Sequence, residues 1–257
     1  MPELPDVEGF RRILARHTAG RIRRVLVRDE RVLRGTNARS FKGALRGRRF
    51  RSPERHGKWL IARTDGRAIV LFHFGMTGAL LWRRAGAREQ RHDHIVFVID
   101  GGELRYNDMR KLQGVWLLGD EKEVQRRLGM LGPDALKVTW TEFEAALGRH
   151  GRLKVLLMDQ SVIAGLGNLL VDEICWRARI SPLRPALRLA GAQRKRLYRE
   201  MRRILRAAIP TGRVPPRPSW LTGRRDTPGA TCPRCGSKLL RRRVAGRTTV
   251  WCPRCQP

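Results

Sequence analysis

Acidic residues are scarce in this chain of 257 residues, and several marks of common protein classes are missing. Asp and Glu total 23 against 55 Lys and Arg, so the formal net charge is +32. No apolar run approaches the roughly 20 residues that span a membrane. The N-terminus lacks the succession of basic, apolar and small residues typical of a signal peptide. We therefore expect a cytoplasmic protein.

So large a positive charge repels itself unless it meets a polyanion, and nucleic acid is the favoured partner. A basic proteome and an acidic membrane surface are the alternatives, although the first does not explain an excess this large. Apolar residues make up 41% of the chain, which excludes a disordered polycation. The length allows two or three compact units with real cores.

Cysteine is also rare, and its placement indicates metal instead of disulfides. Four of the five cysteines form the pattern C-x2-C-x16-C-x2-C, namely Cys232, Cys235, Cys252 and Cys255. Four protein thiolates around one tetrahedral ion leave no open position, so we expect one structural Zn²⁺. A redox dithiol or a chance pairing is the alternative. Cys175 stands alone in an apolar helical stretch and is expected in the core.

Hydrophobic periodicity in the N-terminal half changes from a helix to strands. From Pro5 onward, Val7, Phe10 and Leu14 recur at helical spacing. Between about residues 21 and 120, short apolar stretches separated by the turn signals TDGR and DGGE follow. This pattern predicts an antiparallel sandwich or barrel instead of alternating β-α units.

The C-terminal half reads as helices up to a segment rich in Pro and Gly. TEFEAALGRH is one expected helix, with Thr141 as its N-cap and Glu144 three residues later. Two further helices meet at the corner GLGN, where Asn168 would head the second helix and free N–H groups would suit a phosphate. A plain helix cap is the commoner meaning of such a corner. The expected domains are 1–122, 123–215 and 216–257.

The first residues, MPELPDVE, are unusual for a basic chain, because two prolines and three acids lie within eight residues at the start of the first expected helix. A helix-start pattern would explain them alone. The segments PELPDVE, HGKWL, HFGMTG, HDH and GLGN, however, occur in this order ahead of the four-cysteine ribbon. Together they resemble the formamidopyrimidine-DNA glycosylase and endonuclease VIII family, and the PEL start favours the formamidopyrimidine branch.

This resemblance implies an α+β fold. An N-terminal helix plus a two-layered antiparallel β-sandwich would be followed by a helix–two-turn–helix domain and a C-terminal zinc ribbon. It also implies a base-excision repair enzyme that removes oxidised or otherwise damaged bases from double-stranded DNA. We expect a monomer associated with the nucleoid.

The resemblance further implies that the chain's terminus is catalytic. Family members lose the initiator Met, and the exposed proline amine attacks C1′ of the damaged nucleotide. An α-amino group has a pKa of about 8, so a nucleophilic fraction exists at neutral pH. The resulting iminium is an electron sink that permits strand cleavage by elimination. By this resemblance Pro2 is the nucleophile, Glu3 transfers protons and Lys58 binds phosphate near the lesion.

A set of DNA-binding residues follows from the same resemblance. Met76 would fill the gap left by an everted base, and Arg110 would face the orphaned base. Asn168 and Arg247 would clamp phosphates on either side of the lesion. Core packing for Met76 and a strand-end charge for Arg110 are the plain alternatives. The expected set is His73, Met76, His92, Arg110, Asn168 and Arg247.

Three departures from the family pattern bear on the substrate. Asp6 replaces the usual Glu of the lesion pocket, and in DMRKLQG the aromatic wedge of the family becomes Leu112 or is displaced. The stretch 211–231 is shorter and richer in proline than the loop that closes over 8-oxoguanine. We therefore expect a more open pocket that takes ring-opened purines, hydantoins, oxidised pyrimidines or bulky adducts.

Two other functions fit part of the sequence. A non-catalytic damage-binding protein on the same scaffold would bind DNA without cleaving it, although it would have no need of Glu3. A zinc-ribbon protein that binds RNA or the ribosome would explain only the charge and the ribbon.

Overall fold

The computed structural model describes residues 2–257, which form two compact units. Residue 2 and residues 6–130 make up the first unit, and residues 3–5 and 131–257 make up the second. The three residues after Pro2 therefore belong to the second unit, although their neighbours in sequence belong to the first.

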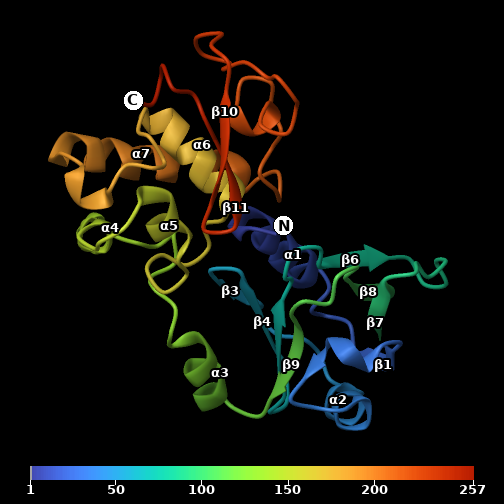
Figure 1. The fold of residues 1–257 in the computed structure, drawn as a ribbon. Coiled ribbons are helices and arrows are strands. Elements are labelled where there is room, and N and C mark those ends of the chain that lie inside the picture. The colour runs from blue at the N-terminus through green and yellow to red at the C-terminus, as the bar shows by residue number, and fades with distance from the viewer. Residues whose placement is uncertain (1) are drawn as a thin grey trace. The chain divides into compact units, whose positions relative to one another are not determined.

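The first unit is a sandwich of two sheets, as expected (Figure 1). One sheet has the order β1-β7-β8-β6, and the other has the order β2-β9-β5-β4-β3. The pairings are antiparallel except that of β2 with β9. The strands are β1 (Ile22–Val27), β2 (Leu33–Arg34), β3 (Glu54–His56), β4 (Trp59–Arg63), β5 (Ile69–His73), β6 (Ala79–Arg83), β7 (Asp93–Ile99), β8 (Gly102–Asn107) and β9 (Gly114–Leu118).

The core of the sandwich is rich in aromatic side chains. The rings of Phe72 and Phe97 lie 6.2 Å apart, and that of Tyr106 lies 6.2 Å from Phe72. Helix α1 (Leu4–Ala15) buries Val7 and Leu14 in the same cluster. The expected turns TDGR and DGGE join β4 to β5 and β7 to β8.

Two short helices in this unit were missed by the sequence analysis, as was the short 3-10 helix η1 (Glu30–Val32). Helix α2 (Ala38–Leu45) lies within the stretch expected to hold strands only. The Asn37 side chain accepts a hydrogen bond from Ser40 N at 2.9 Å, and Phe41 is fully buried. Helix α3 (Glu121–Leu128) is capped in the same way by Asp120. In segments this short, an N-cap hydrogen bond and one buried side chain determine whether a helix forms.

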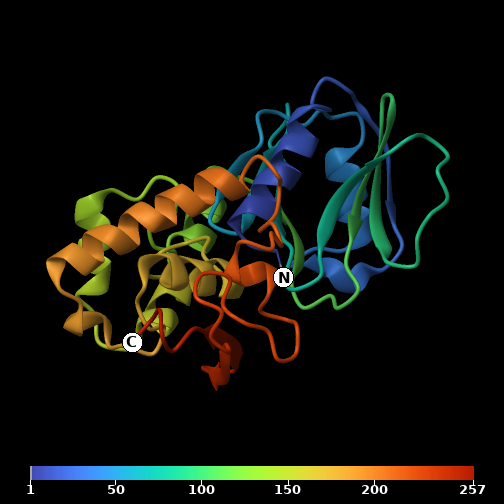
Figure 2. The ribbon, with the colours of Figure 1, turned by 90° about the horizontal axis from the view of Figure 1, so that it is seen from above.

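The second unit is built from four helices and two 3-10 turns, and its longest helix is seen along its length in Figure 2. None of the described helices is both long and apolar enough to cross a membrane. The N-cap of the first helix is Thr139, which forms a capping box with Glu142, so the expected cap at Thr141 was wrong. The elements are α4 (Trp140–Leu147), α5 (Leu153–Met158), α6 (Asn168–Ala178), η2 (Ala186–Arg188), α7 (Gly191–Ala208) and η3 (Leu221–Gly223).

The proline-rich stretch 211–231 packs onto α6 and is not an open linker. Trp220 is 5% exposed and Leu221 is fully buried. Thr222 N donates to the carboxylate of Glu173 on α6 at 3.1 Å. Two apolar anchors and a buried acceptor therefore hold the middle of a segment that sequence composition alone assigns to a loop.

The four-cysteine ribbon contains a two-stranded hairpin of β10 (Leu240–Val244) and β11 (Arg247–Trp251). Its turn residues Ala245 and Gly246 have φ of 45° and 73°. A two-residue turn with both φ values positive matches the right-handed twist of the flanking strands. Arg247 is consequently fixed as the first residue after the turn.

Candidate active site and zinc centre

The carboxylate of Glu3 occupies the N-terminus of α6. Glu3 is fully buried, and its Oε1 and Oε2 accept hydrogen bonds from Leu169 N at 2.7 Å and Leu170 N at 3.0 Å. The first N–H groups of a helix have no partner within it and lie at its positive end, so a carboxylate is stabilised there. The sequence analysis left these N–H groups for a phosphate, and the structure gives two of them to Glu3 instead.

The two glycines of the GLGN corner make room for this contact. Leu4 N donates to Gly165 O at 3.1 Å. A Cβ on Gly165 would lie 2.5 Å from Leu4 Cδ1, and one on Gly167 would lie 2.3 Å from Glu3 Cδ. Gly165 also has φ of +111°, which side chains rarely adopt. The two glycines thus allow residues 3–4 to approach the corner closely.

Gln160 holds the corner in shape, and sequence reasoning missed it. Its Nε2 donates to Leu166 O at 3.0 Å, and its Oε1 accepts from Gly165 N at 3.0 Å. One side-chain amide thus bonds a donor and an acceptor of an irregular backbone segment that lacks the regular hydrogen bonds of a helix or sheet. A Gln two residues after an apolar helix was the available signal.

In the first unit, Lys58 and His73 lie close together at the end of the five-stranded sheet. Lys58 lies in the short turn between β3 and β4, and His73 ends β5. Burial, and secondarily the charge of Lys58, lowers the pKa of His73 to about 4. Gly75 N donates to His73 Nδ1 at 3.1 Å, and the Trp59 ring lies 4.6 Å from the imidazole. His73 is therefore a neutral ring with Nδ1 as an acceptor.

The structure brings Met76 and Arg110 together. Arg110 Nη1 lies 3.1 Å from Met76 Sδ, although the two residues are 34 apart in sequence. The buried Asp108 joins their loops, since its Oδ1 accepts from Thr77 Oγ1 at 2.5 Å and from Arg110 N at 3.2 Å. Leu112, two residues further on, is 49% exposed. Sequence reasoning found the two outer side chains but not the Thr77–Asp108 pair that fixes them.

His92 is half-buried beside the same loop, and its carbonyl accepts from Asp108 N at 3.0 Å. The imidazole of the HDH motif that is buried belongs to His94, whose Nε2 lies 2.7 Å from Asp108 O. The motif thus anchors the Arg110 loop through His94, which the sequence analysis did not single out. A DNA contact for His92 stays a prediction.

Asn168 and Arg247 both lie in the second unit. Asn168 is the first residue of α6, and its Oδ1 is buried without a hydrogen-bond partner among the described residues. Arg247 is half-buried at the start of β11. Their phosphate contacts remain predictions. The buried Asn168 Oδ1, however, is a hydrogen-bond acceptor that lacks a donor among the described residues.

A buried ionic network ties the ribbon to α6. Asp172 Oδ1 accepts from Lys154 Nζ at 2.6 Å, and its Oδ2 accepts from Arg225 Nη2 at 2.9 Å. Lys154 and Arg225 each donate a further bond to Thr248 O, and Val250 N donates to Asp172. Burial raises the pKa of Asp172, and the two cations act in the opposite sense. The network fixes strand β11, and with it Arg247, against the helix that Asn168 heads.

The four ribbon cysteines fit a tetrahedral zinc ion. Their Sγ atoms all lie within 4.8 Å of one another, with 4.0 Å between Cys232 and Cys255 and 3.5 Å between Cys235 and Cys252. Zn–S bonds of about 2.3 Å give a tetrahedron with S–S edges of about 3.8 Å. The indole Nε1 of Trp176 on α6 donates to Cys232 Sγ at 3.4 Å. A hydrogen bond of this kind orients a thiolate ligand.

Cys175 is fully buried in the helical core, as expected, and burial raises the pKa of its thiol. It takes no part in the group of four.

Three family profiles match successive parts of the chain. The formamidopyrimidine-DNA glycosylase N-terminal domain matches residues 1–115, and the formamidopyrimidine-DNA glycosylase H2TH domain matches residues 131–215. The zinc finger found in FPG and IleRS matches residues 229–257.

Whole-chain relatives agree with these profiles. The formamidopyrimidine-DNA glycosylases of Heliobacterium modesticaldum and Halorhodospira halophila are each 38% identical, and each match covers 100% of both chains. The glycosylase of the same name from Lactococcus lactis, solved bound to DNA containing an abasic site, is 29% identical. That match has a TM-score of 0.87 and covers 99% of each chain.

These matches define a base-excision repair DNA glycosylase that carries one structural zinc site. The chain belongs to the formamidopyrimidine-DNA glycosylase family, whose members are also abasic-site lyases. The prediction of a DNA glycosylase is confirmed. The predicted fold class, with a helix, a β-sandwich, a helical domain and a zinc finger, is confirmed as well.

Proposed function

We propose that Pro2 is the nucleophile of this glycosylase and lyase and that Glu3 is its proton-transfer group. The observation that supports this assignment is the clamp on Glu3, whose two carboxylate oxygens are held by Leu169 N and Leu170 N. A catalytic group must be fixed within a fraction of an ångström to act, and two helix N–H bonds supply that fixation. Because Glu3 adjoins Pro2 in sequence, the same clamp restrains the nucleophile.

The proposed reaction begins once Met1, which lies outside the described residues, has been removed. The lone pair of the Pro2 nitrogen attacks C1′, and the bond from C1′ to the damaged base breaks with its electron pair leaving on the base. The Pro2 amine loses its proton to the departing base, and the bond from C1′ to O4′ then breaks as O4′ takes a proton from Glu3, which leaves an iminium between Pro2 and C1′. The iminium accepts the electrons released when a C2′ proton leaves, and the 3′ phosphate then departs.

Lys58 and His73 act on the DNA from the first unit in this proposal. Lys58 supplies the positive charge that binds a phosphate. The lowered pKa of His73 keeps its ring neutral at physiological pH, so the ring does not repel the Lys58 ammonium group. Met76 and Arg110 are already in contact. Met76 fills the gap left by the everted base, and Arg110 contacts the orphaned base on the other strand. The exposed Leu112 beside them acts as an aliphatic wedge in place of an aromatic one.

Asn168 and Arg247 grip the backbone from the second unit. Since Glu3 occupies Leu169 N and Leu170 N, a phosphate is bound there by side chains and not by those helix N–H groups. Asn168 Nδ2 donates to the phosphate, whose oxygens only accept, and the orphaned Oδ1 accepts from an ordered water, which removes a cost of about 1–3 kcal/mol. His92 is proposed as a further, weaker DNA contact.

We propose a broad substrate range that includes ring-opened purines and oxidised pyrimidines. The Lactococcus lactis enzyme has been solved with DNA containing an oxidised pyrimidine, with Fapy-dG and with N7-benzyl-Fapy-dG. In this chain the stretch 211–231 is anchored on α6 by Trp220 and Leu221, which favours an open lesion site. We also propose functional parts at 1–122, 123–215 and 216–257, and a monomer that works on the nucleoid.

Borohydride trapping tests the assignment of the nucleophile. Met-processed protein mixed with abasic-site duplex and sodium borohydride should give a covalent complex whose linked peptide begins at Pro2. Pro2→Gly with Glu3→Gln should reduce trapping at least a hundredfold while binding to a non-cleavable abasic analogue changes less than tenfold. Trapping through a lysine, or trapping by protein that retains Met1, would contradict the proposal.

A further inference from the structure

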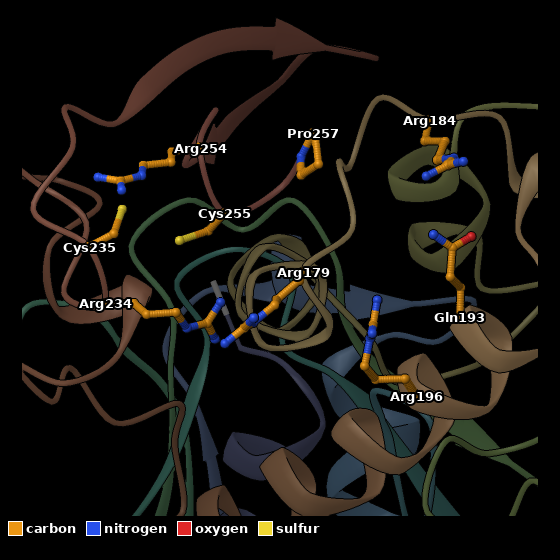
Figure 3. A pocket seen from close by; sticks show the side chains of 9 residues that line it. All are labelled: Arg179, Arg184, Gln193, Arg196, Arg234, Cys235, Arg254, Cys255 and Pro257. Atoms are coloured by element: carbon orange, nitrogen blue, oxygen red, sulfur yellow. The ribbon is translucent and has the colours of Figure 1, made fainter.

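A pocket of about 730 Å³ lies within the second unit, beside the zinc centre (Figure 3). We call it the arginine pocket, since five guanidinium side chains line it. They come from the stretch after α6, from α7 and from both cysteine knuckles. The five are Arg179, Arg184, Arg196, Arg234 and Arg254.

Neutral groups hold two of these arginines in place. Arg196 Nε donates to Ala178 O at 2.7 Å, and Arg234 Nη1 donates to Trp176 O at 3.1 Å. The Arg234 guanidinium also lies 4.3 Å above the Trp176 ring. Each keeps most of its five N–H donors for another partner. Among the described residues that line the pocket, none is acidic.

The zinc centre offsets only part of this charge. Cys235 and Cys255 line the same pocket, and a zinc ion with four thiolates carries a net charge of about −2. Five guanidiniums therefore leave about three positive charges uncompensated, or about two if a carboxylate at Pro257 is counted against them. The arginines exceed what the metal centre needs as counter-charge.

Arg179 occupies a backbone position that suits glycine. It follows the last turn of α6 with φ of 56° and ψ of 42°, in the left-handed region. Its side chain is exposed and reaches the pocket. Glycine would relieve the backbone there, so Arg179→Gly removes one of the charges without a cost in folding.

We propose that the arginine pocket binds a compact oligophosphate, such as a tripolyphosphate chain or the triphosphate of a nucleotide. A guanidinium group binds phosphate oxygens through a pair of parallel N–H hydrogen bonds. An anion with several adjacent phosphates can therefore bind several guanidinium groups at once. Sites that follow a nucleic-acid strand form an extended groove. Here the arginines come from separate segments around one hollow. In the view of Figure 3 the guanidinium groups of Arg179 and Arg234 are drawn near each other, and that of Arg254 is drawn beside Cys235. An arrangement around a single hollow favours a small anion over a strand.

Calorimetric titration of the zinc-loaded full chain with tripolyphosphate, in phosphate-free buffer of low ionic strength, tests the proposal. We expect binding that weakens as salt is added. The double variant Arg179→Gly with Arg254→Gln should weaken it at least tenfold. Arg188→Gln, an exposed arginine near Arg184 that does not line the pocket, is the matched control and should change it less than twofold.

A second titration uses protein saturated with a duplex that carries a non-cleavable abasic analogue. Undiminished tripolyphosphate binding supports a free oligophosphate as the ligand. Loss of binding in the presence of duplex assigns the pocket to nucleic-acid phosphates and overturns the proposal in this form.

The rate of zinc release to a chromogenic chelator distinguishes arginines that bind an oligophosphate from arginines that only balance the charge of the metal centre. Faster release from the double variant, with no tripolyphosphate binding by the wild type, would make the arginines counter-charges for the thiolates and end the proposal. Equal affinity of wild type and double variant would end it as well. None of these readouts depends on glycosylase activity.

Discussion

Glu3 is a buried carboxylate whose place is set by residues more than 160 positions away. Its two hydrogen bonds to Leu169 N and Leu170 N require that no side chain project from Gly167. The basic chain thus keeps an acid at its start because a helix N-terminus, which is a partial positive charge, receives it. A single methyl group at the corner decides whether this contact exists.

Gly167→Ala should therefore separate folding from catalysis. The new Cβ would lie 2.3 Å from Glu3 Cδ, and the flexible carboxylate must leave its two N–H partners. We expect at least a tenfold loss of abasic-site lyase rate with a stability loss of only about 1–2 kcal/mol, measured by urea unfolding. Gly191→Ala, where no atom lies within 4 Å of the new Cβ, should change neither quantity noticeably. A fully active Gly167→Ala enzyme would refute the role of the close approach.

His73 makes stability depend on pH in a defined window. Its pKa is lowered to about 4 in the folded protein from 6.5. As the pH falls below about 6.5, the unfolded chain binds a proton that the folded protein refuses, so stability is lost until about pH 4. Calorimetric Tm values of wild type should fall more steeply between pH 7 and pH 4.5 than those of His73→Gln. Parallel Tm curves for the two proteins would show that His73 does not carry this dependence.

At the scale of elements, helix α6 joins the buried Glu3 carboxylate to the zinc ribbon. Its N-terminus binds Glu3, its middle carries Asp172 in the ionic network with β11, and Trp176 near its end donates to Cys232. These three contacts lie along one helix of 11 residues. A change in its position would therefore move the Glu3 carboxylate, the Arg247 strand and the metal ligands together.

Asp172→Asn should show how much the network contributes. The amide keeps the size of the carboxylate but removes the buried counter-charge of Lys154 and leaves Arg225 with only the exposed Asp226, at a cost of about 3–5 kcal/mol. We expect a lower urea midpoint together with weaker binding to abasic duplex. Asp226→Asn removes an exposed partner of the same Arg225 and should cost less than about 1 kcal/mol. Equal effects of the two variants would contradict a special role for the buried carboxylate.

At the scale of the whole molecule, the zinc site stabilises a ribbon that has little core of its own. The cluster around it consists of Trp176, Leu221, Val250 and the cysteines Cys232 and Cys252. So few apolar side chains cannot hold the ribbon folded alone, and metal binding supplies the missing free energy.

Removal of zinc by a chelator should therefore unfold the ribbon while leaving the sandwich intact. We expect Trp fluorescence to change as the Trp176 indole loses Cys232, and salt-sensitive DNA binding to fall at least tenfold. The matched variants are Cys252→Ser, which should contain no zinc, and Cys175→Ala, which should retain one equivalent by elemental analysis. Zinc-free protein with unchanged DNA affinity would contradict the structural role.

Much of this protein follows from local sequence. The C-x2-C pairs predict the zinc site, because the spacing itself brings two thiolates to one ion. Alternating apolar residues and the TDGR and DGGE turns predict antiparallel strands, since each depends on a few adjacent residues. The family motifs further indicated the order of the domains and the importance of the first residues.

Tertiary contacts decided what local patterns left open. TWTEFE contains two overlapping capping boxes. The one headed by Thr139 is used, so that the helix starts at Trp140, whose ring packs 5.7 Å from the Tyr198 ring on α7. Likewise, the free N–H groups of the GLGN corner suit any anion, and only the folded chain shows that Glu3 takes them. Local sequence determines which contacts a segment is able to make. Packing selects among them, since a buried group must find its partner wherever the chain places one.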